Sequence, residues 1–207
     1  MYITRHRAVT DPHLREQLWR LYVRGYSQPD RLPTSEAVDR EEFDRHLRSD
    51  SNRVWVNWDG DTPVVMTLIA TDITSTRWLN PAYFERHHAQ RFASGLVHYV
   101  MWVVVDPVCD VRGANVALAQ QALAAEARDG ALLVFDVPES FQPRLDGGAA
   151  ELMLRMARMV GDVQLVPLAT QRYYALDFAS TPPNDPTSTT DRNVTTTIET
   201  NTRVRIA

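Results

Sequence analysis

The feature that most constrains the fold is a pair of apolar segments joined by a helix-forming stretch. Val97 to Val105 is apolar at almost every position, as expected of a central strand covered on both faces. Ala131 to Val137 has the same character, and the stretch from Ala114 to Arg128 between them predicts a helix that ends at Gly130. Parallel strands joined by a helix form a right-handed crossover. We therefore expect the two segments to be neighbouring parallel strands of one sheet.

Shorter patterns predict the other elements. Asp11-Pro12 and Asp39 with Glu42 mark the starts of two helices, which precede the first expected strand. Asp59-Gly60-Asp61 marks a hairpin turn between two strands. The remaining expected elements are a helix from Asn80-Pro81 to about Phe92, a helix from Ala149 to Met159, and a closing hairpin of Asp162–Leu168 and Arg172–Phe178. This order predicts an α/β fold (α+β mixed sheet), with a central mixed sheet flanked by helices on both faces.

The composition changes abruptly at Ala179. Thr, Ser, Asn, Asp and Pro dominate from there to the end, and the last apolar residues are isolated. Such a segment buries too little apolar surface to offset the entropy of ordering it. We expect a folded domain over residues 1–178 and a disordered polar tail over residues 179–207, whose removal should leave the melting temperature nearly unchanged.

The composition also argues against several classes of protein. No apolar run approaches the roughly 18 residues of a membrane span, and no apolar segment follows the first basic residues, so we expect a cytoplasmic protein. A net charge of −4 argues against nucleic-acid binding through a global field and leaves open only a local basic patch. Cys109 is the only cysteine, which rules out an intramolecular disulfide and a cysteine-based zinc site, and no metal is expected. All 22 basic residues are arginine, so no lysine is present for Schiff-base chemistry.

The loop after the first apolar segment carries an Arg112-Gly113 pair directly before a helix. Free amides at a helix N-terminus, together with the helix dipole, favour an anion there. Gly113 would let the backbone approach a phosphate closely, and Arg112 could add a bidentate hydrogen bond. An ordinary helix start with a solvated arginine is the other interpretation of these residues.

The order of elements and this loop together resemble the GNAT acyltransferase superfamily, over about Tyr2 to Phe178. In that superfamily an Arg/Gln-x-x-Gly-x-Gly/Ala pattern holds the coenzyme A pyrophosphate with its amides. The resemblance implies this role for Arg112, Gly113, Ala114, Asn115, Val116 and Ala117, with Asn115 in the place of the central glycine. It also implies that backbone groups of Val103, Val104 and Val105 pair with the pantetheine of acetyl-CoA or another acyl-CoA. The two buried strands would have to splay apart to admit it.

The resemblance implies a tyrosine as general acid on the helix after the second buried strand, but residues 151–159 contain none. Tyr173 and Tyr174, on the expected closing hairpin, could protonate a leaving thiolate, or they could be ordinary half-buried strand tyrosines. Asp136 and Glu139, at the end of the second buried strand, could accept a proton from an amine, or they could be exposed loop carboxylates.

The function that the resemblance implies is acyl-CoA-dependent N-acyl transfer, such as acetyl transfer, to an amine of a small molecule or a peptide. The expected partners are such amines, and neither nucleic acid nor a membrane is expected to bind. Whether the chain forms a homodimer is left open. Two alternatives remain open: a catalytically inactive GNAT-like binding module, and a transferase that uses a carrier-protein thioester as donor.

Overall fold

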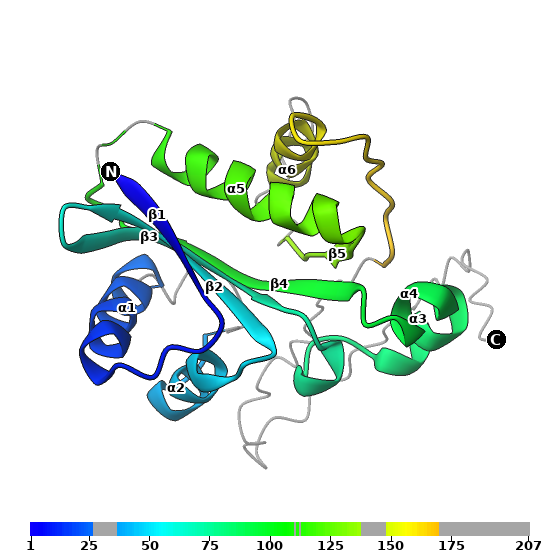
Figure 1. Ribbon diagram of the computed structural model, residues 1–207, viewed down its shortest axis with the longest axis horizontal. Coiled ribbons are helices and arrows are strands. Elements are labelled where there is room, and N and C mark those ends of the chain that lie inside the picture. Colours follow the sequence, from blue (N-terminus) through cyan, green and yellow to red (C-terminus); the bar gives the residue numbers. More distant parts are fainter. Residues whose placement is uncertain (27–36, 110, 112, 138–147, 170–207) are drawn as a thin grey trace, which may run out of the picture. The chain divides into compact units, whose positions relative to one another are not determined.

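A computed structural model of the chain describes residues 1–26, 37–109, 111, 113–137 and 148–169 (Figure 1). All of them belong to the first of two compact units, Met1–Ala169, and the second unit, Thr170–Ala207, lies outside the described residues. The expected strand Arg172–Phe178 and the expected tail therefore remain predictions.

Five strands form one mixed sheet, and they follow one another in the sheet in the order β1-β2-β3-β4-β5. The strands are β1 (Tyr2–His6), β2 (Asn52–Asp59), β3 (Thr62–Ala70), β4 (Val97–Val105) and β5 (Leu132–Val134). Neighbours are antiparallel from β1 to β4, whereas β4 and β5 are parallel. The predicted parallel pairing of the two apolar segments is confirmed.

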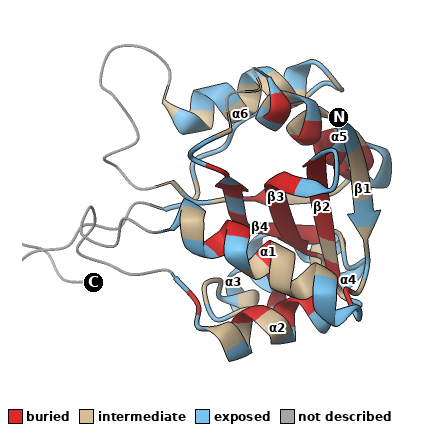
Figure 2. Ribbon diagram, turned by 90° about the vertical axis from the view of Figure 1, so that its left-hand side faces the viewer, coloured by how far each residue is buried: buried red, intermediate tan, exposed pale blue. Residues whose placement is uncertain are grey.

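Helices lie on both faces of this sheet, as predicted (Figure 1). The helices are α1 (Pro12–Gly25), α2 (Arg40–Arg48), α3 (Pro81–His87), α4 (Ala89–Ala93), α5 (Ala114–Asp129) and α6 (Ala149–Arg158), with a 3-10 turn, η2 (Ile73–Ser75), before α3. Because strand side chains alternate, Val54 and Val56 pack with α1 and α2, while Trp55 packs with α5. Buried residues accordingly run along the strands between the helical layers (Figure 2).

The predicted helix and turn signals act as expected. Asp11 Oδ1 accepts a hydrogen bond from the His13 amide at 3.0 Å, and Asp39 Oδ1 accepts one from the Glu42 amide at 2.8 Å. These bonds satisfy amides that the first turn of a helix leaves without partners. Gly60, at the tip of the β2–β3 hairpin, has a φ of 54°, a region that favours glycine.

A buried charged cluster joins α5 to the sheet. Glu126 of α5 and His98 of β4 are 3% and 2% exposed, and Glu126 Oε2 is hydrogen-bonded to His98 Nδ1. Arg53 of β2 donates to Glu126 Oε1 at 2.7 Å and to Asp129 Oδ2 at 2.6 Å. A buried carboxylate is tolerated when it is paired and hydrogen-bonded, so this cluster compensates Glu126 and fixes α5 over β2 and β4.

The expectation that two helices precede the first strand was wrong, because β1 comes before α1. Tyr2–His6 has few apolar residues, and it forms an edge strand whose pairing partner, β2, lies about 50 residues away in the sequence. The helix expected from Pro81 to Phe92 is divided into α3 and α4 at His88, whose φ and ψ of −135° and 40° are not helical.

The strand expected over Asp162–Leu168 was also wrong, since the structure gives these residues no regular secondary structure. Leu165 and Val166 are 42% and 60% exposed. A β-branched, apolar composition favours a strand only when a neighbouring strand and a buried face are available. This segment has no strand partner within the described part of the chain, and Leu168, at its end, packs against a core cluster without one.

Candidate functional site

The parallel pairing of β4 with β5 ends early. Its three residue pairs are Val97 with Leu132, His98 with Leu133, and Tyr99 with Val134. β4 then continues along β3 to Val105, and β5 has no further partner for it among the described residues. We call the stretch Val100–Val105 the open edge. Its unpaired main-chain groups could form hydrogen bonds with an extended ligand that contains amides.

A β-bulge lies at the start of the open edge. Leu68 of β3 pairs with Trp102 and Ile69 pairs with Val100, so Met101 is the extra residue of β4. A bulge leaves one residue unpaired and reverses which face the following side chains occupy. Val100 accordingly packs in the core under α5, whereas Trp102 packs in the core under α1 and α2.

The alternation of side chains along β4 gives the three valines predicted to bind pantetheine different environments. Val104 is buried against α1, whereas Val103 and Val105 are 48% and 40% exposed. Exposed valines are unusual in a central strand, and these two lie beyond the last residue of β4 that pairs with β5. The structure therefore places accessible apolar side chains beside an edge of β4 that has no strand partner among the described residues.

The chain leaves β4 through a turn held by Asp106, which is 5% exposed. The Asp106 amide donates to the Val64 carbonyl at 2.9 Å, and Asp106 Oδ1 accepts from the Val108 amide at 3.1 Å. Arg24 of α1 donates to Asp106 Oδ2. These bonds fix the direction in which the chain passes from the open edge toward α5.

The helix start predicted to hold a pyrophosphate is the first turn of α5. Gly113 has a φ of 80° and provides no side-chain cap, so the first amides of the helix depend on other partners. The Val116 amide donates to Asn115 Oδ1 at 2.9 Å, and the Ala117 amide donates to the Gly113 carbonyl. The Asn115 side chain thus already accepts a hydrogen bond from one of the amides that were predicted to bind the pyrophosphate. Arg112 lies outside the described residues.

Among the predicted catalytic residues, Asp136 lies at the point where β4 and β5 separate. Its Oδ1 accepts a hydrogen bond at 2.6 Å from the hydroxyl of Tyr99, the last residue of β4 that pairs with β5. Tyr99 is 3% exposed, while Asp136 is exposed. Glu139, Tyr173 and Tyr174 lie outside the described residues.

Tyr99 was missed in the sequence because its segment was treated as a uniformly apolar strand. The signal was present, since Tyr99 is the only hydroxyl-bearing side chain between Val97 and Val105. Its ring packs with Val134 in a core cluster that also contains Ile73 and Phe84, whereas Phe135 packs in the cluster under α5. Tyr99 and Asp136 therefore lie on the face of the sheet opposite α5.

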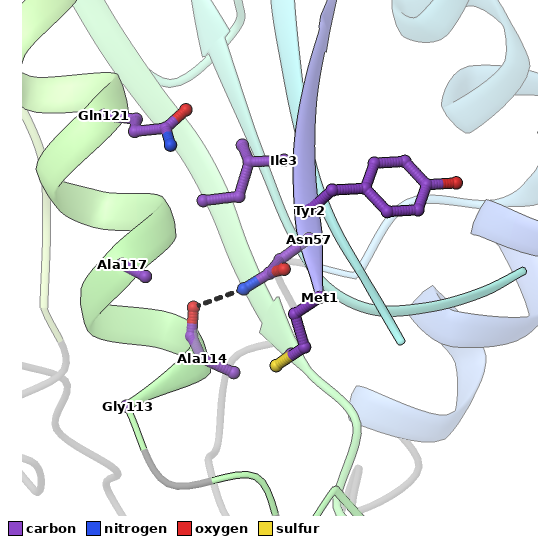
Figure 3. A pocket seen from close by; sticks show the side chains of 8 residues that line it. All are labelled: Met1, Tyr2, Ile3, Asn57, Gly113, Ala114, Ala117 and Gln121. Atoms are coloured by element: carbon purple, nitrogen blue, oxygen red, sulfur yellow. Dashed lines mark hydrogen bonds between the residues drawn. The ribbon is translucent and has the colours of Figure 1, made fainter. Parts of the chain in front are cut away.

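A pocket of about 240 Å³ opens between β1 and the first turns of α5, and it includes part of the predicted pyrophosphate loop (Figure 3). Its lining residues are Met1, Tyr2, Ile3, Asn57, Gly113, Ala114, Ala117 and Gln121, none of them from β4 or β5. Asn57, which is 2% exposed, donates from Nδ2 to the Ala114 carbonyl at 2.8 Å. This bond holds the first turn of α5 against β2, so Asn57 is a second residue that sequence reasoning missed.

The described residues contain neither a cluster of metal-ligating side chains nor a helix suited to a membrane. No group of three or more His, Cys, Asp or Glu side chains there could hold a metal ion. No helix in that part of the chain combines the length and the apolar character needed to cross a membrane.

No family model and no curated protein matches this chain. Solved structures that are similar to it include an aminoglycoside acetyltransferase from an uncultured soil metagenomic sample, with 15% identity, 85% of this chain and 96% of that chain covered, and a TM-score of 0.48. A ribosomal-protein-alanine N-acetyltransferase from Brucella melitensis is 14% identical, with 83% of this chain and 98% of that chain covered and a TM-score of 0.46. An aminoglycoside 6'-N-acetyltransferase from Enterococcus faecium is 15% identical, with 65% of this chain and 61% of that chain covered and a TM-score of 0.41. At these values the similarities carry no inference about substrate or activity.

Proposed function

We propose that this chain is an acyl-CoA-dependent N-acyltransferase that transfers an acyl group, such as acetyl, to an amine of a small molecule or a peptide. The observation that carries the proposal is the open edge of β4, which leads through the turn at Asp106 to the start of α5. Pantetheine is an extended chain with two amides, and the open edge presents main-chain partners beside the exposed Val103 and Val105. The first turn of α5, with Arg112, would receive the pyrophosphate.

Transfer itself needs an acyl carbonyl that is polarised and an amine that can lose a proton. The bulge at Met101 releases main-chain groups from β3 at the inner end of the open edge, where the thioester would lie. Asp136 stands at the same end of the edge and is exposed, so its carboxylate is suited to accept the proton of an amine. Direct transfer between a bound donor and a bound acceptor then depends mainly on positioning.

The decisive experiment is calorimetric titration with coenzyme A and acetyl-CoA. We expect binding, and Arg112→Ala should weaken it by about 1.5–3 kcal/mol, the range for hydrogen bonds to charged groups. The loss should shrink at high salt, because part of the attraction is electrostatic. Normal binding that Arg112→Ala leaves unchanged would remove the loop from the proposed site, even with the donor assignment intact.

Gly113 needs a variant that separates binding from folding. Its φ of 80° is unfavourable for a branched side chain, so Gly113→Val would destabilise the fold as well as block a phosphate. Asparagine tolerates this conformation better. Gly113→Asn should therefore leave the melting temperature closer to the wild-type value while its side chain still impairs coenzyme A binding.

One observation favours a second candidate, a GNAT-like binding module that does not use coenzyme A. Asn115 Oδ1 accepts from the Val116 amide, one of the groups that would bind the pyrophosphate. If this contact blocks the site, wild-type protein will show no affinity for coenzyme A and Asn115→Gly will restore it. If wild-type protein binds, the asparagine side chain must move aside, and Asn115→Gly should increase the affinity.

A further inference from the structure

The acid that protonates the departing thiolate is not supplied by α6. The residues of this helix, Ala149–Arg158, are AAELMLRMAR, without a tyrosine or a histidine. A thiolate can leave more readily when a nearby group gives it a proton, and such general acids contribute typically 10²–10⁴-fold to a rate. If the proposed function is correct, another side chain near the open edge should perform this step.

The hydroxyl of Tyr99 is placed where that step would occur. Tyr99 is the last residue of β4 that pairs with β5, so its position marks the inner end of the open edge. From Val105 back to Val100 the edge spans about 17 Å, at about 3.3 Å per residue. A donor with its pyrophosphate at α5 and its arm along this edge would carry its sulfur toward Tyr99.

The hydroxyl also has a partner that can exchange protons with it. Tyr99 donates to Asp136 Oδ1 at 2.6 Å, within the range of a short, charge-assisted O–H···O⁻ bond. Tyr99 is buried at 3% exposure, whereas Asp136 is exposed on the same face of the sheet. The carboxylate can therefore meet an amine that arrives from solvent, while the phenol is shielded from water.

Two other described groups lie next to Tyr99. The indole ring of Trp78 packs against Tyr99, with 6.3 Å between ring centroids, and carries no charge. His98, the preceding residue, bonds to Glu126 of α5, on the opposite face of the sheet. The hydrogen bond to Asp136 is therefore the contact of Tyr99 from which the proton exchange is argued.

We propose that Asp136 and Tyr99 form a proton relay, in place of the general acid that α6 lacks. A neutral amine attacks the thioester carbonyl, the N–C bond forms, and the Asp136 carboxylate takes a proton from the amine nitrogen. The C–S bond then breaks, sulfur keeps the electron pair, and it receives the hydroxyl proton of Tyr99. The Tyr99 oxygen takes the proton held by Asp136, so the products are an amide and a free thiol and both residues return to their starting states.

The test uses the full chain with acetyl-CoA and, as acceptors, an aliphatic amine, an amino sugar and a peptide α-amine, with water as the fallback acceptor. Tyr99→Phe removes only the hydroxyl, and we expect kcat to fall by about 10²–10⁴-fold. Calorimetric affinity for acetyl-CoA should not change. Asp136→Asn, which retains a hydrogen-bond acceptor but cannot take a proton, should lower kcat similarly.

The pH profile distinguishes a chemical role from a structural one. A wild-type rate that requires a protonated phenol falls at alkaline pH, and Tyr99→Phe should lose this alkaline limb. A merely structural role would lower the rate at every pH and keep the limb. Tyr22→Phe is the matched control, since Tyr22 is also buried at 2% exposure and its hydroxyl accepts from the Val38 amide at 2.9 Å. It should lower stability without changing the shape of the profile.

Each of the following outcomes would overturn the relay. A wild-type profile with no alkaline limb, or a Tyr99→Phe variant with wild-type kcat, rejects Tyr99 as the acid while leaving the acyltransferase proposal standing. Wild-type kcat in Asp136→Asn rejects the relay as well. If wild-type protein binds no acetyl-CoA, or binds it and releases no thiol with any amine or with water, the proposed function fails and the relay fails with it.

Discussion

Arg24, in the last turn of α1, donates two hydrogen bonds to the same carboxylate oxygen of Asp106, from Nη2 at 2.6 Å and from Nε at 3.1 Å. The Asp106 side chain is 6% exposed and that of Arg24 is 42% exposed, so the pair lies at the boundary between core and solvent. Asp106 directly follows β4 and begins the path to α5. The pair therefore couples α1 to the direction in which the proposed pyrophosphate loop leaves the sheet.

Asp106→Asn should weaken both the fold and donor binding. The variant retains an oxygen for the Val108 amide but loses the charge that pairs with Arg24, at a cost of about 1.5–3 kcal/mol. Urea unfolding measures the loss, and titration with coenzyme A measures the effect on the loop. Glu16→Gln is the control, because Glu16 pairs with Arg40 and Arg20 in an exposed setting where ion pairs contribute little. An equal loss in the two variants would contradict the role given to Asp106.

Gly25→Ala, at the end of α1, should disturb the open edge through the contact of α1 with β4. A Cβ at Gly25 would clash with Val104 Cγ1 and lie 3.5 Å from the Val105 carbonyl oxygen. Overpacking costs about 1–3 kcal/mol, which outweighs the gain of up to about 1 kcal/mol from replacing glycine in a helix. We expect a lower melting temperature and weaker coenzyme A binding.

Gly161→Ala is the matched control for this change. Its new Cβ would lie 3.9 Å from the Cβ of Ala127, an ordinary contact, and its backbone is outside the left-handed region. Stability should therefore stay near the wild-type value, and donor binding should not change. Similar behaviour of the two glycine variants would show that α1 does not support β4 closely.

Much of the fold could be predicted because its signals are local. The apolar segments, the caps at Asp11 and Asp39 and the turn at Gly60 each act within a few residues. β1 could not be predicted, because an edge strand with half-exposed residues has no strong sequence pattern and is defined by its pairing with β2. The bulge at Met101 arises from the β3–β4 register, which the sequence of β4 alone does not specify.

The candidate site was predictable only in part, for the same reason. The start of α5 and the carboxylate at Asp136 follow local signals, namely a helix start and the end of a strand. The contact between Tyr99 and Asp136 depends on the parallel register that places Tyr99 beside Val134. Asn57 reaches Ala114 only because α5 folds back over β2.

Stability should fall as the pH is lowered below about 6.5, and His46 should contribute to the fall. Burial lowers the pKa of the His46 imidazole, which packs between Trp78 and Trp102 at 6% exposure; Glu42 opposes this shift, and Arg45 and Arg77 add to it. With the pKa lower in the folded state, the unfolded chain binds more protons between the folded-state pKa and about 6.5. The free energy of unfolding therefore rises with pH across that window, and the contribution of neutral His46 to it is complete above the window.

Urea unfolding at several pH values between about 5 and 8 tests this assignment. His46→Gln should flatten the acidic slope, even if it lowers stability at every pH. Burial also lowers the pKa of His6, so the double variant with His6→Gln should have the flattest profile. An acidic slope that survives unchanged in His46→Gln would assign the loss to other groups.

Asn57 should control the position of the first turn of α5. Its Nδ2 donates to the Ala114 carbonyl, one residue after Gly113, so a loss of this bond should loosen the proposed pyrophosphate site. Asn57→Asp keeps the shape but places a carboxylate against a carbonyl oxygen, and it should reduce both the melting temperature and coenzyme A affinity at neutral pH. A protonated carboxyl can donate the missing hydrogen bond, so the deficit relative to wild type should shrink at acidic pH. Thermal unfolding and titration at two pH values measure this change, and a deficit that does not depend on pH would mean that the bond to Ala114 does not hold α5 in place.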